Sequence, residues 1–191
     1  SDKKQMFIML AVCKVKLLKK KTAVAGDEVT YSLMLRQMQK ASAIQHKGIA
    51  SRHAYSMDGI DYYCGIRDED IGILRQKYDV IILDISFENT FDNTNVTFAR
   101  MVSRLSACDE KILAGSMLPW KSRECEKKME RIERFLDIRG LKMVTLAACD
   151  KEAVSIIKKH GVEVVLIPFE RNPFVISGEN LRSFLELLKI T

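Results

Sequence analysis

The stretch Asp79–Asp84 reads Asp-Val-Ile-Ile-Leu-Asp, and it decides the fold class of this chain. Its four consecutive aliphatic residues, Val80–Leu83, leave no polar face, which indicates a strand that is covered on both sides. Strands of this kind are typical of parallel sheets, because crossover helices pack over both faces of such a sheet. We therefore predict that Asp79–Asp84 is a central strand of a parallel sheet and that Asp84 ends it.

Strands and helices alternate on both sides of this stretch, and the alternation predicts βαβ units. Before it, the sequence predicts a strand at Thr22–Gly26, a helix at Asp27–Ala41, a hairpin turning at Asp58-Gly59, and a helix with an acidic cap at Asp68–Tyr78. After it, the sequence predicts helices at Asn93–Ser106, Trp120–Ile138, Lys151–His160 and Glu179–Ile190, and strands at Lys111–Ser116, Leu141–Ala147 and Val162–Pro168. The expected fold is one α/β domain over residues 1–191, in three layers, with helices on both faces of a mostly parallel, Rossmann-like sheet.

Composition and charge exclude several classes of protein. The 191 residues carry 31 Lys and Arg against 25 Asp and Glu, a net charge of +6, and five lysines gather within Lys14–Lys21. No aromatic residues interleave with these lysines, so we expect a solvated helix face and no strong nucleic-acid signature. The apolar run Met6–Cys13 is too short for a membrane span and lacks the cleavage site of a signal peptide. We expect a cytoplasmic protein.

Cysteine and histidine usage predicts no metal centre of the zinc-finger type. The five cysteines are odd in number and form no CxxC pair: Cys13, Cys64, Cys108, Cys125 and Cys149. Reduced thiols, several of them in the core, explain them better than disulfides. The histidines have no zinc-ligand spacing relative to the cysteines or to one another: His46, His53 and His160. We expect no zinc, haem or flavin.

Polar residues follow several predicted strands, and ligands of open α/β sheets bind beyond the carboxyl ends of strands. The candidates are Asp84, Asp27 after Thr22–Gly26, Ser116 at the end of Lys111–Ser116, and Asp150 after Leu141–Ala147. A carboxylate at Asp84 can hold a magnesium-bound water, accept a phosphoryl group or cap the next turn. Each of the others is either a ligand or a capping residue, and for Asp150 we favour a helix cap.

The order of these elements is similar to that of the MinD/ParA-like ATPase family, which includes septum-site, plasmid-partition and CpaE-like pilus-assembly proteins. The stretch YDVIILD resembles the Walker B strand of P-loop NTPases, KTAVAGDE resembles the acidic-ended strand before it, and KILAGS, KMVTLAACD and VEVVLIPF follow in the family's order. The resemblance implies a P-loop NTPase-like fold, ATP and Mg²⁺ as cofactors, and a homodimer or another protein partner. It implies catalytic roles for Asp27, as the switch aspartate, and for Asp84, as the magnesium-associated aspartate, with Ser116 and Asp150 beside the cofactor.

The sequence departs from this family at the phosphate-binding loop. No segment matches GxxxxGK[ST], and the first glycine is Gly26. In the family's order Gln5–Met9 is the first strand and Leu10–Lys20 the first helix, but no turn residues separate them. Either the loop has been lost, which leaves a degenerate or regulatory ATPase acting through partners, or the sequence shown omits a stretch near Met9-Leu10. Without the loop, tight ATP binding is not expected.

Two alternatives stay open. A receiver-like signalling domain would use Asp84 as phosphoacceptor and Ser116 as switch hydroxyl, but it needs an acidic pair after its first strand, and Met9–Lys16 contains none. An unrelated Rossmann-like enzyme is the second alternative, although the chain holds neither GxGxxG nor GxSxG.

Overall fold

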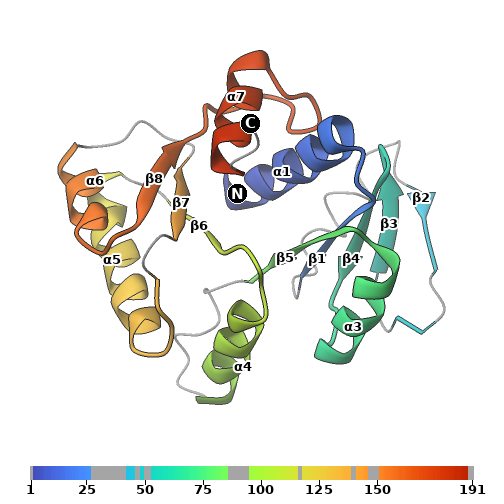
Figure 1. Cartoon of the computed structure of the whole chain (residues 1–191), viewed down its shortest axis with the longest axis horizontal. Coiled ribbons are helices and arrows are strands. Elements are labelled where there is room, and N and C mark those ends of the chain that lie inside the picture. Colours follow the sequence, from blue (N-terminus) through green and yellow to red (C-terminus); the bar gives the residue numbers. More distant parts are fainter. Residues whose placement is uncertain are drawn as a thin grey trace. The chain divides into compact units, whose positions relative to one another are not determined.

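The computed structural model describes residues 2–26, 42–45, 48–49, 53–85, 95–115, 118–138, 141–145 and 151–188. The chain divides into two compact units, Phe7–Phe91 and Ser1–Met6 with Asp92–Thr191, whose elements are drawn in Figure 1. Each unit is described by itself, and the single domain over residues 1–191 stays a prediction.

The unit Phe7–Phe91 contains a five-stranded sheet in the order β2-β3-β4-β1-β5 (Figure 1). Its strands are β1 (Thr22–Gly26), β2 (Ser42–Ala43), β3 (His53–Met57), β4 (Ile60–Cys64) and β5 (Val80–Asp84). β1 runs parallel to both β4 and β5, whereas β2, β3 and β4 pair antiparallel. The predicted α/β fold with parallel-rich pairing is confirmed, and an antiparallel hairpin extends the sheet beyond β4.

The hairpin between β3 and β4 turns at Asp58-Gly59, as predicted. Asp58 has φ 51° and Gly59 has φ 78°, so both central residues lie in the left-handed region that a type I′ turn requires. This turn matches the right-handed twist of the flanking strands, which pair Met57 with Ile60 directly beside it.

β1, not β5, has a parallel neighbour on each side in the described sheet. All five residues of β1 are buried, whereas β5 is the last strand in the described order and only Ile82 and Asp84 are buried in it. The prediction that Asp79–Asp84 is central is therefore wrong for the described sheet. Aliphatic content predicts that a strand is covered, but it does not predict the order of strands in the sheet.

A chain of hydroxyl groups runs through the core of this unit. The Tyr63 and Tyr78 hydroxyl oxygens lie 2.7 Å apart, and the Tyr78 hydroxyl donates to Asp61 Oδ2 at 2.5 Å. Burial is the main cause that raises the pKa of Tyr63 to about 12, and burial followed by the hydrogen bond to Asp61 raises the pKa of Tyr78 further. The Lys21 ammonium group also lies over the Tyr78 ring, with Nζ 5.0 Å from the ring centroid.

The first element of the chain is a single helix, α1 (Asp2–Leu18). The prediction of a strand at Gln5–Met9 followed by a helix at Leu10–Lys20 is wrong, because no turn interrupts this segment and its Met, Leu and Ala residues favour a helix. Met6–Cys13 are buried, with at most 7% of any side chain exposed, and Lys16, Lys19 and Lys20 are exposed as expected. No helix in the described part of the chain combines the length and apolar character needed to cross a membrane.

The helix α3 (Asp68–Lys77) follows β4 and begins differently from the prediction of an acidic cap. Arg67 is the N-cap residue. Its backbone N–H donates at 2.8 Å to Oδ2 of Asp70, the third residue of the helix. The acidic residues of this first turn still favour the helix, because they lie at the positive end of its dipole.

The second unit contains a parallel three-stranded sheet in the order β6-β7-β8, as the βαβ alternation predicts. Its strands are β6 (Ile112–Ala114), β7 (Lys142–Thr145) and β8 (Glu163–Leu166), and its helices are α4 (Asn95–Ser106), α5 (Pro119–Glu133), α6 (Lys151–Lys158) and α7 (Gly178–Leu187). Gly161, with φ 71°, donates its N–H to Lys158 O and ends α6, as predicted.

Several predictions differ from the described structure or fall outside it. The helix predicted at Trp120–Ile138 ends at Glu133, and Phe135 is 61% exposed rather than part of an apolar stripe. Phe135 instead packs edge-on against Phe98 with ring centroids 5.2 Å apart. Cys13, predicted to lie in apolar surroundings, is buried, and so is Cys64, whereas Cys108, for which the same was predicted, is only half-buried. Cys149 and the predicted helix Asp27–Ala41 lie outside the described residues.

Two glycine substitutions should change stability in opposite directions. Gly59→Ala places a Cβ at φ 78°, so we expect it to lower the free energy of unfolding by about 1–2 kcal/mol. Gly72 is an exposed residue of α3, and nothing lies within 4 Å of a Cβ added there. We therefore expect Gly72→Ala to raise the free energy of unfolding by about 0.5–1 kcal/mol. Urea unfolding measures both, and equal effects of one sign would contradict this account of the turn.

The tyrosine network predicts how stability depends on alkaline pH. The pKa of Tyr63 is raised to about 12 in the folded state, against about 10 in an unfolded chain, so folding binds a proton above pH ~10. The stabilisation is complete below pH ~10 and is lost as pH rises toward about 12. Between pH ~9 and ~11 the free energy of unfolding should fall less steeply in Tyr63→Phe than in the wild type. Tyr55→Phe, outside the network, is the control, and identical slopes in all three proteins would refute the prediction.

Candidate functional site

The predicted site residue Asp84 lies at the carboxyl end of β5, in register with Gly26 at the end of β1. The Asp84 side chain is only 3% exposed. A Cβ added at Gly26 would lie 3.1 Å from Asp84 Cβ and 3.2 Å from Asp84 O, so only a glycine leaves the present space beside this carboxyl group. The ends of two parallel strands thus meet at the edge where ligands of such sheets bind.

The other predicted site residues fall outside the described residues. Asp27 follows Gly26 in the sequence, Ser116 follows Gly115, and Asp150 precedes α6, but the structure describes none of the three. Their roles as switch residue, cofactor contact and helix cap therefore stay predictions.

The residues at Asp84 fit part of what ATP and Mg²⁺ would need. A carboxylate oxygen is a ligand type that Mg²⁺ prefers, directly or through a bound water. A triphosphate also needs a cradle of backbone N–H groups and a lysine, and no GxxxxGK[ST] segment exists in this sequence to supply them. The Asp84 corner can accordingly hold a cation or act as a switch position, but the chain offers no recognisable triphosphate cradle.

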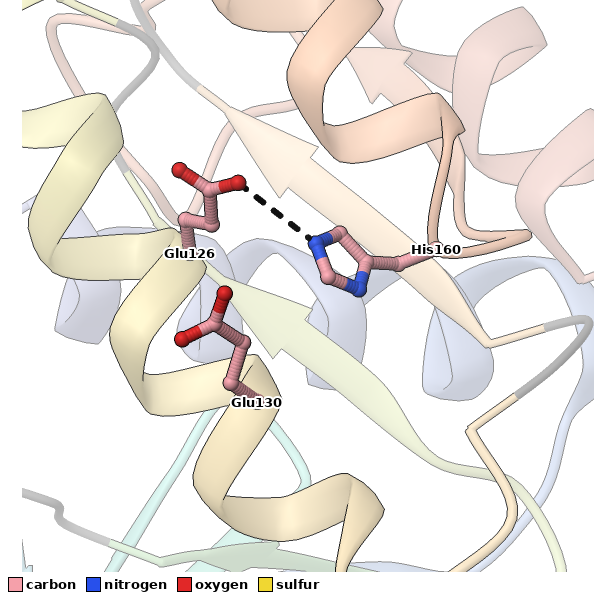
Figure 2. A group of neighbouring side chains, drawn as sticks. All are labelled: Glu126, Glu130 and His160. Carbon is pink, nitrogen blue, oxygen red and sulfur yellow. Dashed lines mark ion pairs between the residues drawn. The ribbon is translucent and has the colours of Figure 1, made fainter.

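A second group of polar side chains gathers in the unit that contains α5 and α6. Glu126 and Glu130 lie one turn apart on α5, and His160 lies in the turn after α6, as Figure 2 shows. One ligand atom from each of the three residues lies within 4.8 Å of the others. The His160 Nε2 atom is 3.7 Å from Glu126 Oε1, and His160 Nδ1 is 3.0 Å from Glu133 Oε1. We call these four residues the α5–His160 cluster.

Lys159 adds a positive charge to the edge of this cluster by pairing with Glu126. The hydrogen bond from Lys159 is the main cause that lowers the pKa of Glu126, and the same bond raises the pKa of Lys159. Glu126 is therefore ionised at neutral pH, although only 18% of its side chain is exposed.

Sequence reasoning missed the α5–His160 cluster. The signal was the spacing Glu126, Glu130 and Glu133, which places three carboxylates along one face of a helix. Such a run usually indicates a solvated face, and nothing in the sequence shows that His160 folds back against it.

The fold is similar to that of known proteins, although the sequence is not. No protein-family model and no curated protein sequence matches this chain. The structure is similar to the MinD cell division protein of Aquifex aeolicus, with a TM-score of 0.67 and 13% identity, over 100% of this chain and 92% of that one. It is also similar to a chain of the MinC:MinD cell division protein complex of Aquifex aeolicus, with a TM-score of 0.65 and 12% identity, over 100% and 93%. The chain thus has a MinD-like α/β fold.

Gly26→Ala should disturb the Asp84 corner. The added methyl group would lie closer to Asp84 than ordinary van der Waals contact allows, so β1 and β5 must separate slightly. We expect the free energy of unfolding to fall by about 1–3 kcal/mol, measured by urea unfolding. Gly178→Ala is the matched control, because nothing lies within 4 Å of its added Cβ. An unchanged free energy in Gly26→Ala would mean that the two strand ends adapt without strain.

Proposed function

We propose that this chain is a MinD-like protein that acts through protein partners, as a degenerate or regulatory ATPase. One observation carries the proposal. A MinD-like fold extends over the whole chain and keeps a buried aspartate at the end of β5, while the sequence holds no GxxxxGK[ST] segment. The architecture is retained, and the segment that binds the phosphates in such proteins is not recognisable.

The burial of Asp84 supports a role beyond packing. Burying a carboxyl group costs free energy that an aliphatic residue at the end of Val80–Leu83 would not cost. Gly26 permits this close packing, because a Cβ added there would lie 3.1 Å from Asp84 Cβ. A buried carboxyl group at the edge where ligands of such sheets bind favours a cation ligand or a switch residue over a purely structural one.

The proposed dependence on partners rests on the neighbouring structures and on the missing loop. One of the similar structures is a complex of MinC with MinD. A chain that has the fold but lacks the phosphate cradle keeps a surface for protein contacts and loses the parts that accelerate phosphoryl transfer. We infer that this chain forms a homodimer or binds another protein, and that ATP with Mg²⁺ at most regulates this binding.

ATP hydrolysis and Mg²⁺-ATP binding test the catalytic half of the proposal. The purified chain, its intact mass checked against the sequence, is compared with Asp84→Asn, which keeps the shape of the side chain and removes its charge. We expect no hydrolysis by the wild type above that of Asp84→Asn. Mg²⁺-ATP should raise the free energy of unfolding, followed by thermal shift, by far less than the ~2.7 kcal/mol that a ligand at one hundred times its Kd supplies. Asp84→Asn should abolish any such stabilisation.

Three results would decide against the proposal. Hydrolysis by the wild type that disappears in Asp84→Asn, with a folded variant by circular dichroism, would indicate a working ATPase. Loss of the fold in Asp84→Asn would make Asp84 structural. The proposed action through protein partners would be wrong if light scattering gave a monomer and proximity labelling in cells enriched no protein over the tag alone.

A further inference from the structure

We propose that Glu126, Glu130 and His160 bind a divalent transition-metal ion such as Zn²⁺. The site lies within the second unit and is separate from the Asp84 corner. The expectation of no zinc rests on cysteine and histidine spacing alone, whereas this site combines one imidazole with two carboxylates. Zn²⁺ accepts both imidazole nitrogen and carboxylate oxygen as ligands.

The three donors are already near the positions that a metal ion requires. Ligands about 2.1 Å from a tetrahedral Zn²⁺ lie roughly 3.4 Å from one another. The described ligand atoms lie within 4.8 Å of one another. Small rotations of two glutamate side chains on the same face of α5 close this difference, and the backbone need not move (Figure 2).

The second contact of His160 orients its ring for a metal ion. His160 Nδ1 lies 3.0 Å from Glu133 Oε1, and a proton on Nδ1 donated to Glu133 leaves the lone pair on Nε2. Metal-bound histidines are commonly held in this way, with the second nitrogen donating to a carboxylate that fixes the ring and raises its basicity. Glu133 is therefore a positioning residue in the proposed site.

The Nε2 atom itself has no hydrogen-bond partner among the described residues. It is buried, and its 3.7 Å separation from Glu126 Oε1 is too long for a hydrogen bond. Buried polar atoms without a partner are rare in folded proteins and call for an explanation such as an ion or a water molecule. A metal ion between Nε2 and the two glutamates would provide the missing partner.

Charge favours a divalent ion at the same position. Three carboxylates, those of Glu126, Glu130 and Glu133, gather around His160, and the Lys159 ammonium group pairs with Glu126. A dication bound there would add positive charge where these carboxylates gather. The alternative is an ion-pair cluster that only ties α5 to the turn after α6, and metal titration separates the two.

Isothermal titration of the full chain with ZnCl₂ tests the site. Wild type and Glu124→Gln should bind one Zn²⁺ with the same Kd, because Glu124 lies on α5 but pairs with Lys128. Glu130→Gln and His160→Gln should raise Kd at least tenfold, and Glu133→Gln should raise it about 10- to 100-fold through the histidine. Replacing Zn²⁺ by Co²⁺ should give ligand-field bands without a thiolate charge-transfer band, which excludes the cysteines as ligands.

Two outcomes would overturn the proposal. The first is the absence of saturable Zn²⁺ binding by the wild type. The second is binding at another place in the chain, shown either by a Kd that does not change in Glu130→Gln and His160→Gln or by a thiolate band with Co²⁺, which would assign the ion to cysteines. Circular dichroism of the metal-free variants checks that each is folded, and Glu130 is an exposed position where substitution leaves the core intact.

Discussion

The pairing of β1 with both β4 and β5 is the constraint on which the first unit depends. Thr22–Gly26 is paired along its whole length on both sides, and all five residues are buried. At the end of β1, Gly26 allows a close approach, because an added Cβ there would lie 3.1 Å from Asp84 Cβ. The same pairing sets Asp84 beside Gly26, and it is extended at the other end by the Lys21 backbone N–H, which donates to Asp79 Oδ2 at 2.8 Å.

Local signals in the sequence predicted most elements, and tertiary order was the part they could not predict. Asp58-Gly59 is a two-residue signal, and its turn forms as expected because the left-handed backbone is a local property. Val80–Leu83 is a strand as expected, but its aliphatic residues measure how well it can be covered, not where it lies in the sheet. Met6–Cys13 fits a buried strand or a buried helix by its apolar pattern, and the absence of a turn together with its Met, Leu and Ala residues favours the helix that forms.

The two candidate sites differ in how far the sequence could reveal them. Asp84 was predicted because a polar residue at the end of an apolar strand is visible in one short stretch. The α5–His160 cluster was not, because His160 lies 30 residues after Glu130 and joins it only when α6 packs beside α5 (Figure 1). The sequence of an acidic helix face does not show which residues pack against it. A site of this kind can therefore be found only once the packing of the helices is known.

The long-range pairing of β1 also has a consequence for the order of events during synthesis. Thr22 pairs with Ile60 on one side and with Val80 on the other, 38 and 58 residues later. At about 5–20 residues per second, β5 is made roughly 3 to 12 seconds after β1. Closing such long loops is slow compared with forming the β3–β4 hairpin, whose two strands are adjacent. Until β4 and β5 are available β1 has no parallel partner, and its alanines and glycine offer little apolar surface to other nascent chains.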